Sequence, residues 1–190
     1  MLVIGVLALI GVLAVWHEPR PRNFGVIEPG LLYRSGRLSP GTLRRVVEDR
    51  HIRTIVDFGA YAPGSREELR EQELAEQLGV RRVRLRLRGD GTGDPNEYVE
   101  ALRVMTDSGA QPVLIHCAAG TNRTGVCTML YRHIIQGDDF KGAYREAMKY
   151  GHDAGTDWVS LTYLADWSDE IRRSFETGET IPWAVVVRNK

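Results

Sequence analysis

Apolar runs of a few residues alternate along the chain with longer stretches of mixed polarity. Residues 53–58 ("RTIVDF") and 112–116 ("PVLIH") are short and rich in branched apolar side chains, which is typical of buried strands. Residues 31–38 ("LLYRSGRL") indicate a third short strand that ends in a turn. At the end of residues 80–88 ("VRRVRLRLR") apolar and basic side chains alternate strictly, from Val83 to Arg88, and this period of two predicts a half-buried strand.

Helix start and stop signals occupy the stretches between these runs. Ser39 followed by Pro40 is typical of an N-cap with proline in the first helical position. Ser65 and Glu68 have the spacing of a capping box, and Gly79 would end that helix. With Asp94 as a further N-cap, these signals and the later apolar patterns predict helices that begin near residues 40, 66 and 95, and helices near 124–136, 139–150 and 157–175.

Strands and helices therefore alternate along the chain, which favours an α/β domain with a mostly parallel central sheet flanked by helices. Ligand sites in such sheets lie at the carboxyl ends of the strands. Residues 116–124 ("HCAAGTNRT") follow one predicted strand and precede a predicted helix. We therefore expect this segment, called the signature loop below, at that edge of the sheet.

The first sixteen residues carry no polar side chain. As a helix this run would span about 24 Å, somewhat less than the roughly 30 Å hydrocarbon core of a bilayer. Trp16 suits the membrane interface, and Arg20 and Arg22 would hold the following domain in the cytoplasm. The alternatives are an uncleaved signal-like segment, a signal peptide that lacks part of its start and would place the domain outside the cytoplasm, and a tail buried on the domain. We predict a single-pass transmembrane anchor at 1–16, a proline-rich linker at 17–30 and a folded domain at 31–190.

Composition narrows the classes of function. The 190 residues suffice for one domain with a proper core. The formal net charge of zero gives no reason to expect a nucleic-acid partner. Cys117 and Cys127 are too few for a disulfide scaffold, and no Cys/His cluster has the spacing of zinc ligands, so no metal site is predicted.

The signature loop carries the residue types of an anion-binding nucleophile. Backbone N–H groups between a strand and a helix N-terminus form a cradle for phosphate, and Gly120 lets the backbone turn. A thiol at the base of that cradle, Cys117, would be stabilised as the thiolate. Arg123 can bind two phosphate oxygens, and Thr124 can donate its hydroxyl to the thiolate. The substrate-binding residues predicted within the loop are Ala118, Ala119, Gly120, Thr121 and Asn122.

The order His-Cys, five residues, Arg-Thr resembles the signature of the cysteine-dependent protein tyrosine phosphatases. The resemblance extends from about Tyr33 to Trp167 and is greatest to the compact bacterial and atypical dual-specificity branch, with "LYRSGRLS" and "RTGVCTMLYRH" as supporting segments. It implies a three-layer phosphatase fold, Cys117 as nucleophile, Arg123 as phosphate clamp and Thr124 as thiolate partner. It also implies a phosphocysteine intermediate and no metal or other cofactor.

A general acid must protonate the leaving group, and the family supplies an aspartate from a mobile loop upstream of the signature. Asp90 and Asp94 both stand in "RGDGTGDPNE". Asp94 already has a role as a helix N-cap, whereas Asp90 lies in the glycine-flanked part, so we favour Asp90 and keep Asp94 as the alternative. Arg88, next to this loop, is the predicted substrate contact.

Several other residues have two interpretations. The arginines of residues 80–88 form either a positive rim for anionic substrates or a solvated strand face balanced by an acidic helix, with solvation favoured. Cys127 is interpreted as a core residue rather than a redox partner. His116 is expected to shape the loop through a hydrogen bond, and Arg34 and Ser35 are expected to brace it.

The leading functional hypothesis is a phosphatase that acts on protein phosphotyrosine, with dual specificity as a variant. An inositol-phosphate or phosphoinositide phosphatase is the alternative, which the neutral loop residues disfavour. A sulfurtransferase is disfavoured by Arg123–Thr124 and by the upstream aspartate. A phosphate-binding pseudophosphatase would require the loss of Cys117 or Arg123, and both are present. The expected partners are a phosphorylated protein or small phosphomonoester and, through the N-terminal segment, a membrane.

Overall fold

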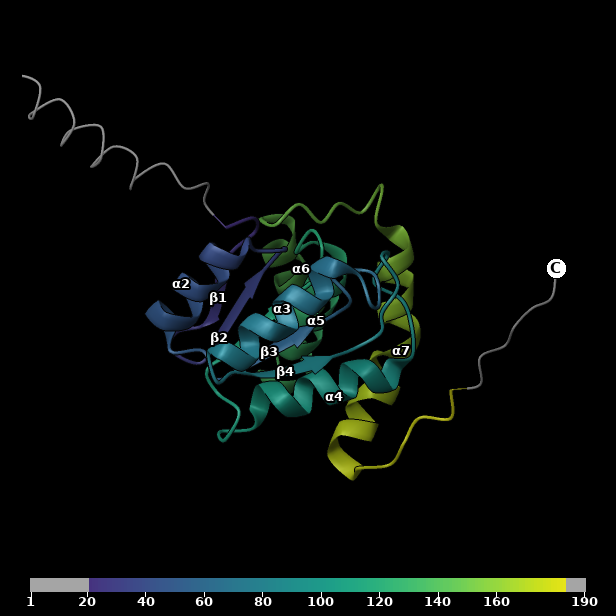
Figure 1. The fold of residues 1–190 in the computed structure, drawn as a ribbon. Coiled ribbons are helices and arrows are strands. Elements are labelled where there is room, and N and C mark those ends of the chain that lie inside the picture. The colour runs from purple at the N-terminus through teal and green to yellow at the C-terminus, as the bar shows by residue number, and fades with distance from the viewer. Residues whose placement is uncertain (1–20, 184–190) are drawn as a thin grey trace, which may run out of the picture.

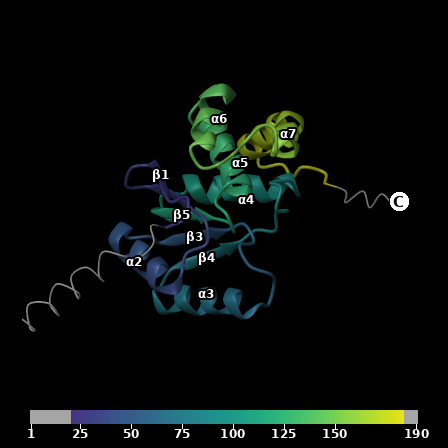
Figure 2. The same ribbon diagram turned by 90° about the horizontal axis from the view of Figure 1, so that it is seen from above.

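The computed structural model describes residues 21–183, which form a five-stranded sheet between two layers of helices (Figures 1 and 2). The strand order is β1-β2-β5-β3-β4. Only the pair β1 and β2 is antiparallel among the paired strands of this described sheet, and the other neighbours are parallel. The strands are β1 (Gly25–Glu28), β2 (Leu32–Ser35), β3 (Thr54–Asp57), β4 (Arg81–Arg84) and β5 (Val113–His116). The predicted three-layer α/β fold with a mostly parallel sheet is confirmed.

Helices cover both faces of the sheet, as the view from above shows (Figure 2). Two helices, α2 (Pro40–Arg50) and α3 (Arg66–Gln77), lie on one face. The opposite face carries α4 (Pro95–Thr106), α5 (Asn122–Leu130), the π-helical turn η1 (Tyr131–Ile135), α6 (Phe140–Met148) and α7 (Trp158–Thr177). Every helix predicted from the sequence is present, with ends that differ by a few residues.

The alternation of side chains along the central strands divides the core in two. Ile55 of β3 and Leu114 of β5 are fully buried in the cluster that includes side chains of α2 and α3. Their neighbours Val56 and Ile115 are fully buried in the larger cluster that includes side chains of α4, α5 and α7. Because side chains of a strand point alternately to its two faces, continuous apolar runs in β3 and β5 supply both cores.

The predicted helix caps form hydrogen bonds in the structure. The Ser39 hydroxyl accepts from the Thr42 N–H at 3.2 Å, and the Asp94 carboxylate accepts from the Asn96 N–H at 2.9 Å. The Ser65 hydroxyl accepts from the Glu68 N–H at 3.2 Å. The other half of the predicted capping box is absent among the described contacts, because Glu68 accepts from the Gly64 N–H and binds Arg82 instead.

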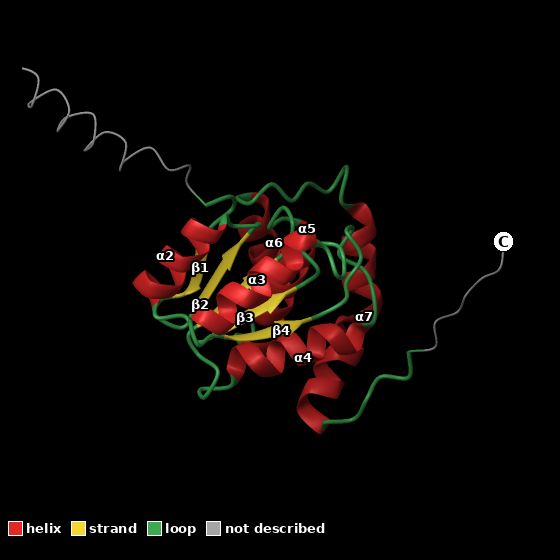
Figure 3. Cartoon of the chain, viewed as in Figure 1, coloured by secondary structure: helices red, strands yellow, loops and turns green. Residues whose placement is uncertain are grey.

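The sequence assigned residues 17–30 to a linker, and this is wrong for part of the segment. Gly25–Glu28 forms β1, an edge strand that pairs with β2 (Figure 3). Only Ile27 among its four residues is buried, so the strand lacks the apolar run by which the other strands were predicted. Backbone pairing with β2, rather than burial of its side chains, therefore holds this strand in the sheet.

The predicted membrane location requires a correction. No helix within residues 21–183 is long and apolar enough to cross a membrane. The segment 1–16, for which an anchor was predicted, lies outside the described residues.

Candidate active site

The signature loop lies where the sequence predicts it, between the carboxyl end of β5 and the start of α5. Cys117 follows β5 directly, and only 2% of its surface is exposed. Its sulfur accepts a hydrogen bond from the Gly120 N–H at 3.2 Å. The loop therefore curls around the thiol and presents backbone donors to it.

Residues from distant parts of the chain hold the loop from outside. The Arg34 guanidinium donates to the Gly120 carbonyl at 2.5 Å and lies 3.8 Å from the centre of the Tyr150 ring. The Asn23 amide donates to the carbonyls of Ala119 at 2.9 Å and Tyr150 at 3.1 Å. Burial lowers the pKa of Arg34 to about 10, so its positive charge is retained at neutral pH.

Helix α5 begins without a side-chain cap, which leaves donors at its N-terminus for a ligand. The Thr121 hydroxyl occupies the cap position but donates to the Tyr150 carbonyl at 3.1 Å. The first N–H groups of a helix have no partner within the helix, and the helix dipole adds partial positive charge there. The backbone N–H groups at the end of the signature loop are therefore suited to bind an anion.

Arg123 is held by one edge of its guanidinium. Its Nη1 donates to the carbonyls of Phe58 at 2.7 Å and Gly59 at 2.5 Å, directly after β3. Its Nε is buried and has no hydrogen-bond partner within residues 21–183. An unpaired buried donor is unfavourable unless a ligand satisfies it, so this edge is suited to a phosphate oxygen.

The Cys117 thiol is acidic for a buried group. Burial alone would raise its pKa, but the Thr124 side chain, the Arg123 charge and the N–H groups of Thr124 and Gly120 together lower it below the ordinary value. Burial instead raises the pKa of Cys127, whose sulfur lies 3.6 Å from that of Met105 in the core. We therefore expect Cys117 to be the more reactive of the two thiols, since the thiolate is the nucleophilic form.

The two candidate acids have different local contacts. Asp94 caps α4, as predicted. Asp90 accepts hydrogen bonds from the Thr92 N–H at 3.0 Å and hydroxyl at 2.7 Å, and its carboxylate lies 3.7 Å from Arg88. Burial raises the pKa of Asp90, but Thr92 and Arg88 outweigh burial and lower it.

The loop that bears Asp90 passes close to the signature loop at Gly91. Gly91 has φ +86°, and a Cβ there would lie 3.1 Å from Val126 and 3.4 Å from the Asn122 carbonyl carbon. The Tyr98 hydroxyl donates to the Gly91 carbonyl at 2.6 Å and so keeps Gly91 close to the start of α5. Asp90 therefore precedes a contact with the start of α5, which supports it over Asp94 as the candidate acid.

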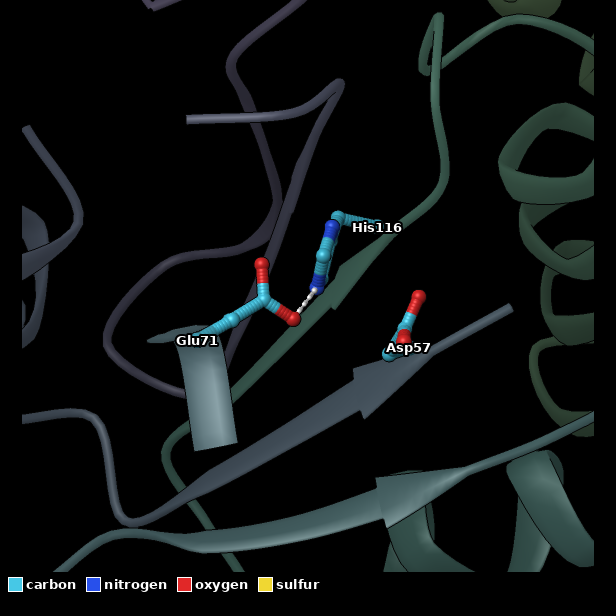
Figure 4. Close-up of side chains that lie close together, drawn as sticks. All are labelled: Asp57, Glu71 and His116. Atoms are coloured by element: carbon cyan, nitrogen blue, oxygen red, sulfur yellow. Dashed lines mark ion pairs between the residues drawn. The ribbon is translucent and has the colours of Figure 1, made fainter. Parts of the chain in front are cut away.

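Three buried residues beside the loop have atoms close enough for a shared cation: Asp57, Glu71 and His116 (Figure 4). Arg82 already donates to the Asp57 carboxylate at 2.6 Å and to the Glu71 carboxylate at 3.1 Å. A metal ion would have to displace this guanidinium or bind next to its charge. These residues therefore do not fit a metal site.

The structure corrects the interpretation of the arginine run. Arg82 was predicted to lie on a solvated face, but only 2% of its side chain is exposed. Arg86 and Arg88 are exposed, and with Arg84 they line a groove whose other wall is the segment 59–63. The run thus divides into a buried part and a rim.

Comparison with known proteins agrees with this geometry. A family model described as "Tyrosine phosphatase family" matches residues 19–181. The chain belongs to this family. It is 34% identical over 110 residues to the dual specificity protein phosphatase TpbA of Pseudomonas aeruginosa strain UCBPP-PA14, a match that covers 56% of this chain and 50% of TpbA. TpbA of strain PAO1 is 38% identical over 111 residues, with the same coverage, so the chain spans about half the length of the curated relatives it matches.

Solved structures show the same fold. The crystal structure of P. aeruginosa TpbA has a TM-score of 0.65 and 24% identity, covering 82% of this chain and 92% of that one. The core catalytic domain of the PP-IP phosphatase SIW14 from S. cerevisiae has a TM-score of 0.65 and 20% identity, covering 85% and 96%. The resemblance to the compact atypical branch of the cysteine-dependent phosphatases, which the signature loop implied, is therefore confirmed.

Several residues that contact the signature loop or lie beside it were not predicted from the sequence. Asn23 was placed in a linker and Tyr150 was given no role, yet both contact the signature loop. Asn23 has φ +50°, a conformation that asparagine tolerates, but nothing in its neighbours along the chain indicates a contact with Ala119. The buried ion pairs of Arg82 were missed because an alternating strand pattern does not reveal what covers its polar face.

Proposed function

We propose that the chain hydrolyses phosphomonoesters through a phosphocysteine intermediate on Cys117. The observation that carries this proposal is a thiol of lowered pKa at the base of a loop that ends in uncapped helix donors. The unpartnered Nε of Arg123 supplies a further donor within the described structure. A nucleophile and a phosphate cradle in one loop are what such a reaction requires.

In the first step the Cys117 thiolate attacks phosphorus, and the bond between phosphorus and the ester oxygen breaks. Asp90 gives its proton to the leaving oxygen from its protonated form, which the lowered pKa of Asp90 makes the minor form near neutral pH. The loop amides of residues 118–122 and the guanidinium of Arg123 bind the three non-bridging oxygens, whose charge they offset through the transition state. Ala118, Ala119, Gly120, Thr121 and Asn122 contribute through their backbone.

In the second step water attacks the phosphocysteine. Asp90, now a carboxylate, accepts a proton from that water, and the bond between phosphorus and sulfur breaks. Inorganic phosphate leaves, and the Thr124 hydroxyl stabilises the departing thiolate. Protons and charges balance over the two steps, so no cofactor or metal is needed in this scheme.

The proposed substrate is protein phosphotyrosine, with phosphoserine and phosphothreonine as secondary substrates. The signature loop carries no Lys or His between Cys117 and Arg123 that would contact additional phosphates. Beyond the loop, the groove along residues 59–63 begins at Gly59, to which Arg123 donates, and Arg88 stands on its rim with 76% of its side chain exposed. This groove can take the polypeptide on one side of the phosphorylated residue, with Arg88 next to its acidic groups.

The test of the proposed function is hydrolysis of p-nitrophenyl phosphate by the full chain. We expect turnover by the wild type and none by Cys117→Ser, because a serine hydroxyl is not ionised at neutral pH. Cys127→Ala is the matched control, since it removes the other cysteine from the core and should retain turnover. Undiminished hydrolysis by Cys117→Ser would contradict the mechanism.

Substrate class is tested separately by phosphate release from a panel of phosphopeptides and inositol phosphates. We expect kcat/KM to be highest for phosphotyrosine peptides. A preference for inositol phosphates would overturn the substrate proposal and leave the mechanism intact. Activity on none of the panel, with phosphate binding retained, would indicate a phosphate-binding pseudophosphatase.

A further inference from the structure

The carbonyl groups of residues 118–121, in the signature loop, all accept hydrogen bonds from donors around the loop. Three of these donors are the Arg37 N–H, the Arg34 guanidinium and the Gly125 N–H. The fourth, on the Ala119 carbonyl, is the side-chain amide of Asn23 at 2.9 Å. The mechanism proposed above assigns no role to Asn23, although its side chain binds one defined peptide group of the loop.

The peptide group that Asn23 binds joins Ala119 to Gly120 and is trans. In a trans peptide the carbonyl and the N–H point in opposite directions. The carbonyl end accepts from Asn23, and the N–H end donates to the Cys117 sulfur at 3.2 Å. This N–H is among the groups that lower the pKa of Cys117. A hydrogen bond on the outer side of the loop therefore fixes a donor on its inner side.

Gly120 would allow this peptide group to turn over. Such a turn changes φ of the residue that follows the peptide group, and glycine is allowed at φ values of either sign. Gly120 has φ +75° in the structure. In the turned state the Ala119 carbonyl, the negative end of the peptide dipole, would face the Cys117 thiolate in place of the N–H. The turned loop would bind phosphate less well, because it would present one donor fewer and a carbonyl oxygen to an anion.

Asn23 is held in place by contacts of its own segment. The carbonyl of the preceding Arg22 accepts from the Gly36 N–H at 2.7 Å. The ring of the following Phe24 stacks on Tyr33 of β2, with ring centres 6.1 Å apart. The amide of Asn23 is therefore fixed from both sides along the chain and does not depend on a bound ligand for its position.

The groups around Asn23 require a donor. Its Nδ2 lies 2.9 Å from the Ala119 carbonyl and 3.1 Å from the Tyr150 carbonyl, and a carbonyl oxygen can only accept. An ionised aspartate has nearly the same shape as asparagine but would place an oxygen without a proton against both carbonyls. Asn23→Asp thus reverses the interaction at almost constant volume.

We propose that Asn23 is a positioning residue for the reaction: it holds the Ala119–Gly120 peptide group with its N–H directed at Cys117 and the phosphate cradle. Within the part of the chain that the structure describes, Asn23 does not contact the thiol, so it acts through the backbone of the loop. This inference rests on the proposed function, in which the signature loop binds phosphate.

The direct test measures binding of an oxyanion without turnover. Tungstate, which is tetrahedral like phosphate, is titrated into the full chain by isothermal titration calorimetry. In Asn23→Asp and Asn23→Gly we expect the Kd to rise by about tenfold or more, as for loss of one hydrogen bond to a charged group. Asn23 has φ +50°, which glycine adopts without strain, so Asn23→Gly removes the amide and keeps the backbone.

The matched control is Arg22→Gln, which changes the neighbouring exposed side chain and should bind tungstate like the wild type. An unchanged Kd in both Asn23 variants would overturn the proposal. Absence of tungstate binding by the wild type would also overturn it, since the loop would then be no oxyanion cradle.

An isotope label on single peptide bonds distinguishes a turned peptide group from a general loss of structure. With ¹³C in the alanine carbonyls and ¹⁵N in glycine, the Ala–Gly pairs of the sequence can be selected by NMR, and these are Ala119–Gly120 and Ala154–Gly155. Tungstate should shift the Gly120 signal of the wild type. In Asn23→Gly that signal should move in the free protein and respond less to tungstate, whereas the signal of the exposed Gly155 should change little. Equal changes in the two signals, or an unchanged Gly120 signal, would overturn the proposal.

Turnover gives a further readout. Loss of one donor to the transition-state oxygens typically lowers kcat by about 10²-fold, and we expect a fall of this size for p-nitrophenyl phosphate in Asn23→Gly. The urea midpoint should change little, and a fall in kcat that unfolding fully accounts for would overturn the proposal. Absence of turnover by the wild type would refute the proposed function, whereas tungstate binding and the Gly120 signal would still decide the role of Asn23.

Discussion

A side chain on Gly120 would collide with the backbone of Gly36: a Cβ at Gly120 would lie 2.6 Å from the Gly36 nitrogen and 2.7 Å from the Ser35 carbonyl carbon. Gly120 has φ +75°, so its backbone conformation also disfavours any side chain. The signature loop thus rests directly on the turn after β2. The close contact joins two segments that the sequence separates by more than eighty positions.

The first prediction concerns this contact. Gly120→Ala should displace the loop and lower kcat by about 10²-fold, the cost typical of misplacing catalytic groups by about 1 Å. Gly137→Ala is the matched control, because Gly137 has φ +76° but no atom within 4 Å of the added Cβ. It shares the backbone strain without the collision and should retain activity. Steady-state hydrolysis of p-nitrophenyl phosphate measures both, and equal losses in the two variants would contradict the argument.

The second prediction separates the two candidate acids. Asp90→Asn should lower kcat by about 10²–10⁴-fold on phenyl phosphate and by much less on p-nitrophenyl phosphate, whose leaving group needs no proton. Asp94→Asn keeps a good N-cap for α4 and should leave both rates nearly unchanged. If instead Asp94→Asn shows the leaving-group dependence and Asp90→Asn does not, the acid is Asp94.

The third prediction tests the burial of Arg82. Arg82→Met leaves the carboxylates of Asp57, Glu68 and Glu71 without their main partner and should reduce the free energy of unfolding by about 3–5 kcal/mol. Arg81→Met changes the preceding residue of β4, which is exposed, and should cost little. Urea denaturation gives both values. A loss below about 1 kcal/mol in Arg82→Met would show that these three carboxylates are solvated.

The fourth prediction follows from the raised pKa of His116. Folding favours the protonated ring, so its contribution to stability is complete below the unfolded pKa of about 6.5 and is lost as pH rises through the folded pKa. The urea midpoint of the wild type should therefore fall between pH 6 and pH 8 by more than that of His116→Asn. Parallel profiles in the two proteins would show that His116 does not titrate differently in the folded state.

Much of the fold was predictable because its signals are local. Ser39, Ser65 and Asp94 cap helices through bonds to residues two or three positions away, and such bonds depend on neighbours in the sequence. The apolar runs of β3 and β5 are buried on both faces, so they mark central strands. β1 was missed because its single buried side chain carries too little pattern.

The candidate site likewise has a part that local sequence signals predict and a part that they do not. The signature loop holds Cys117, Arg123 and Thr124 within eight positions, so their chemistry is visible in the sequence. The acid lies on another loop, and local signals narrowed it only to Asp90 and Asp94. Long-range contacts were not predictable: Asn23 and Ala119 are 96 positions apart, and Arg82 and Asp57 are 25 apart.

The proposed mechanism requires a covalent phosphoenzyme on Cys117. The most direct measurement is rapid acid quenching of the full chain during turnover of p-nitrophenyl phosphate, followed by proteolysis and mass spectrometry. We predict one phosphoryl group on the peptide that contains Cys117, and none in Cys117→Ser. The level of this phosphopeptide should be higher in Asp90→Asn if breakdown of the intermediate becomes the slow step. Phosphate attached to a different residue, or continued turnover by Cys117→Ser, would contradict it.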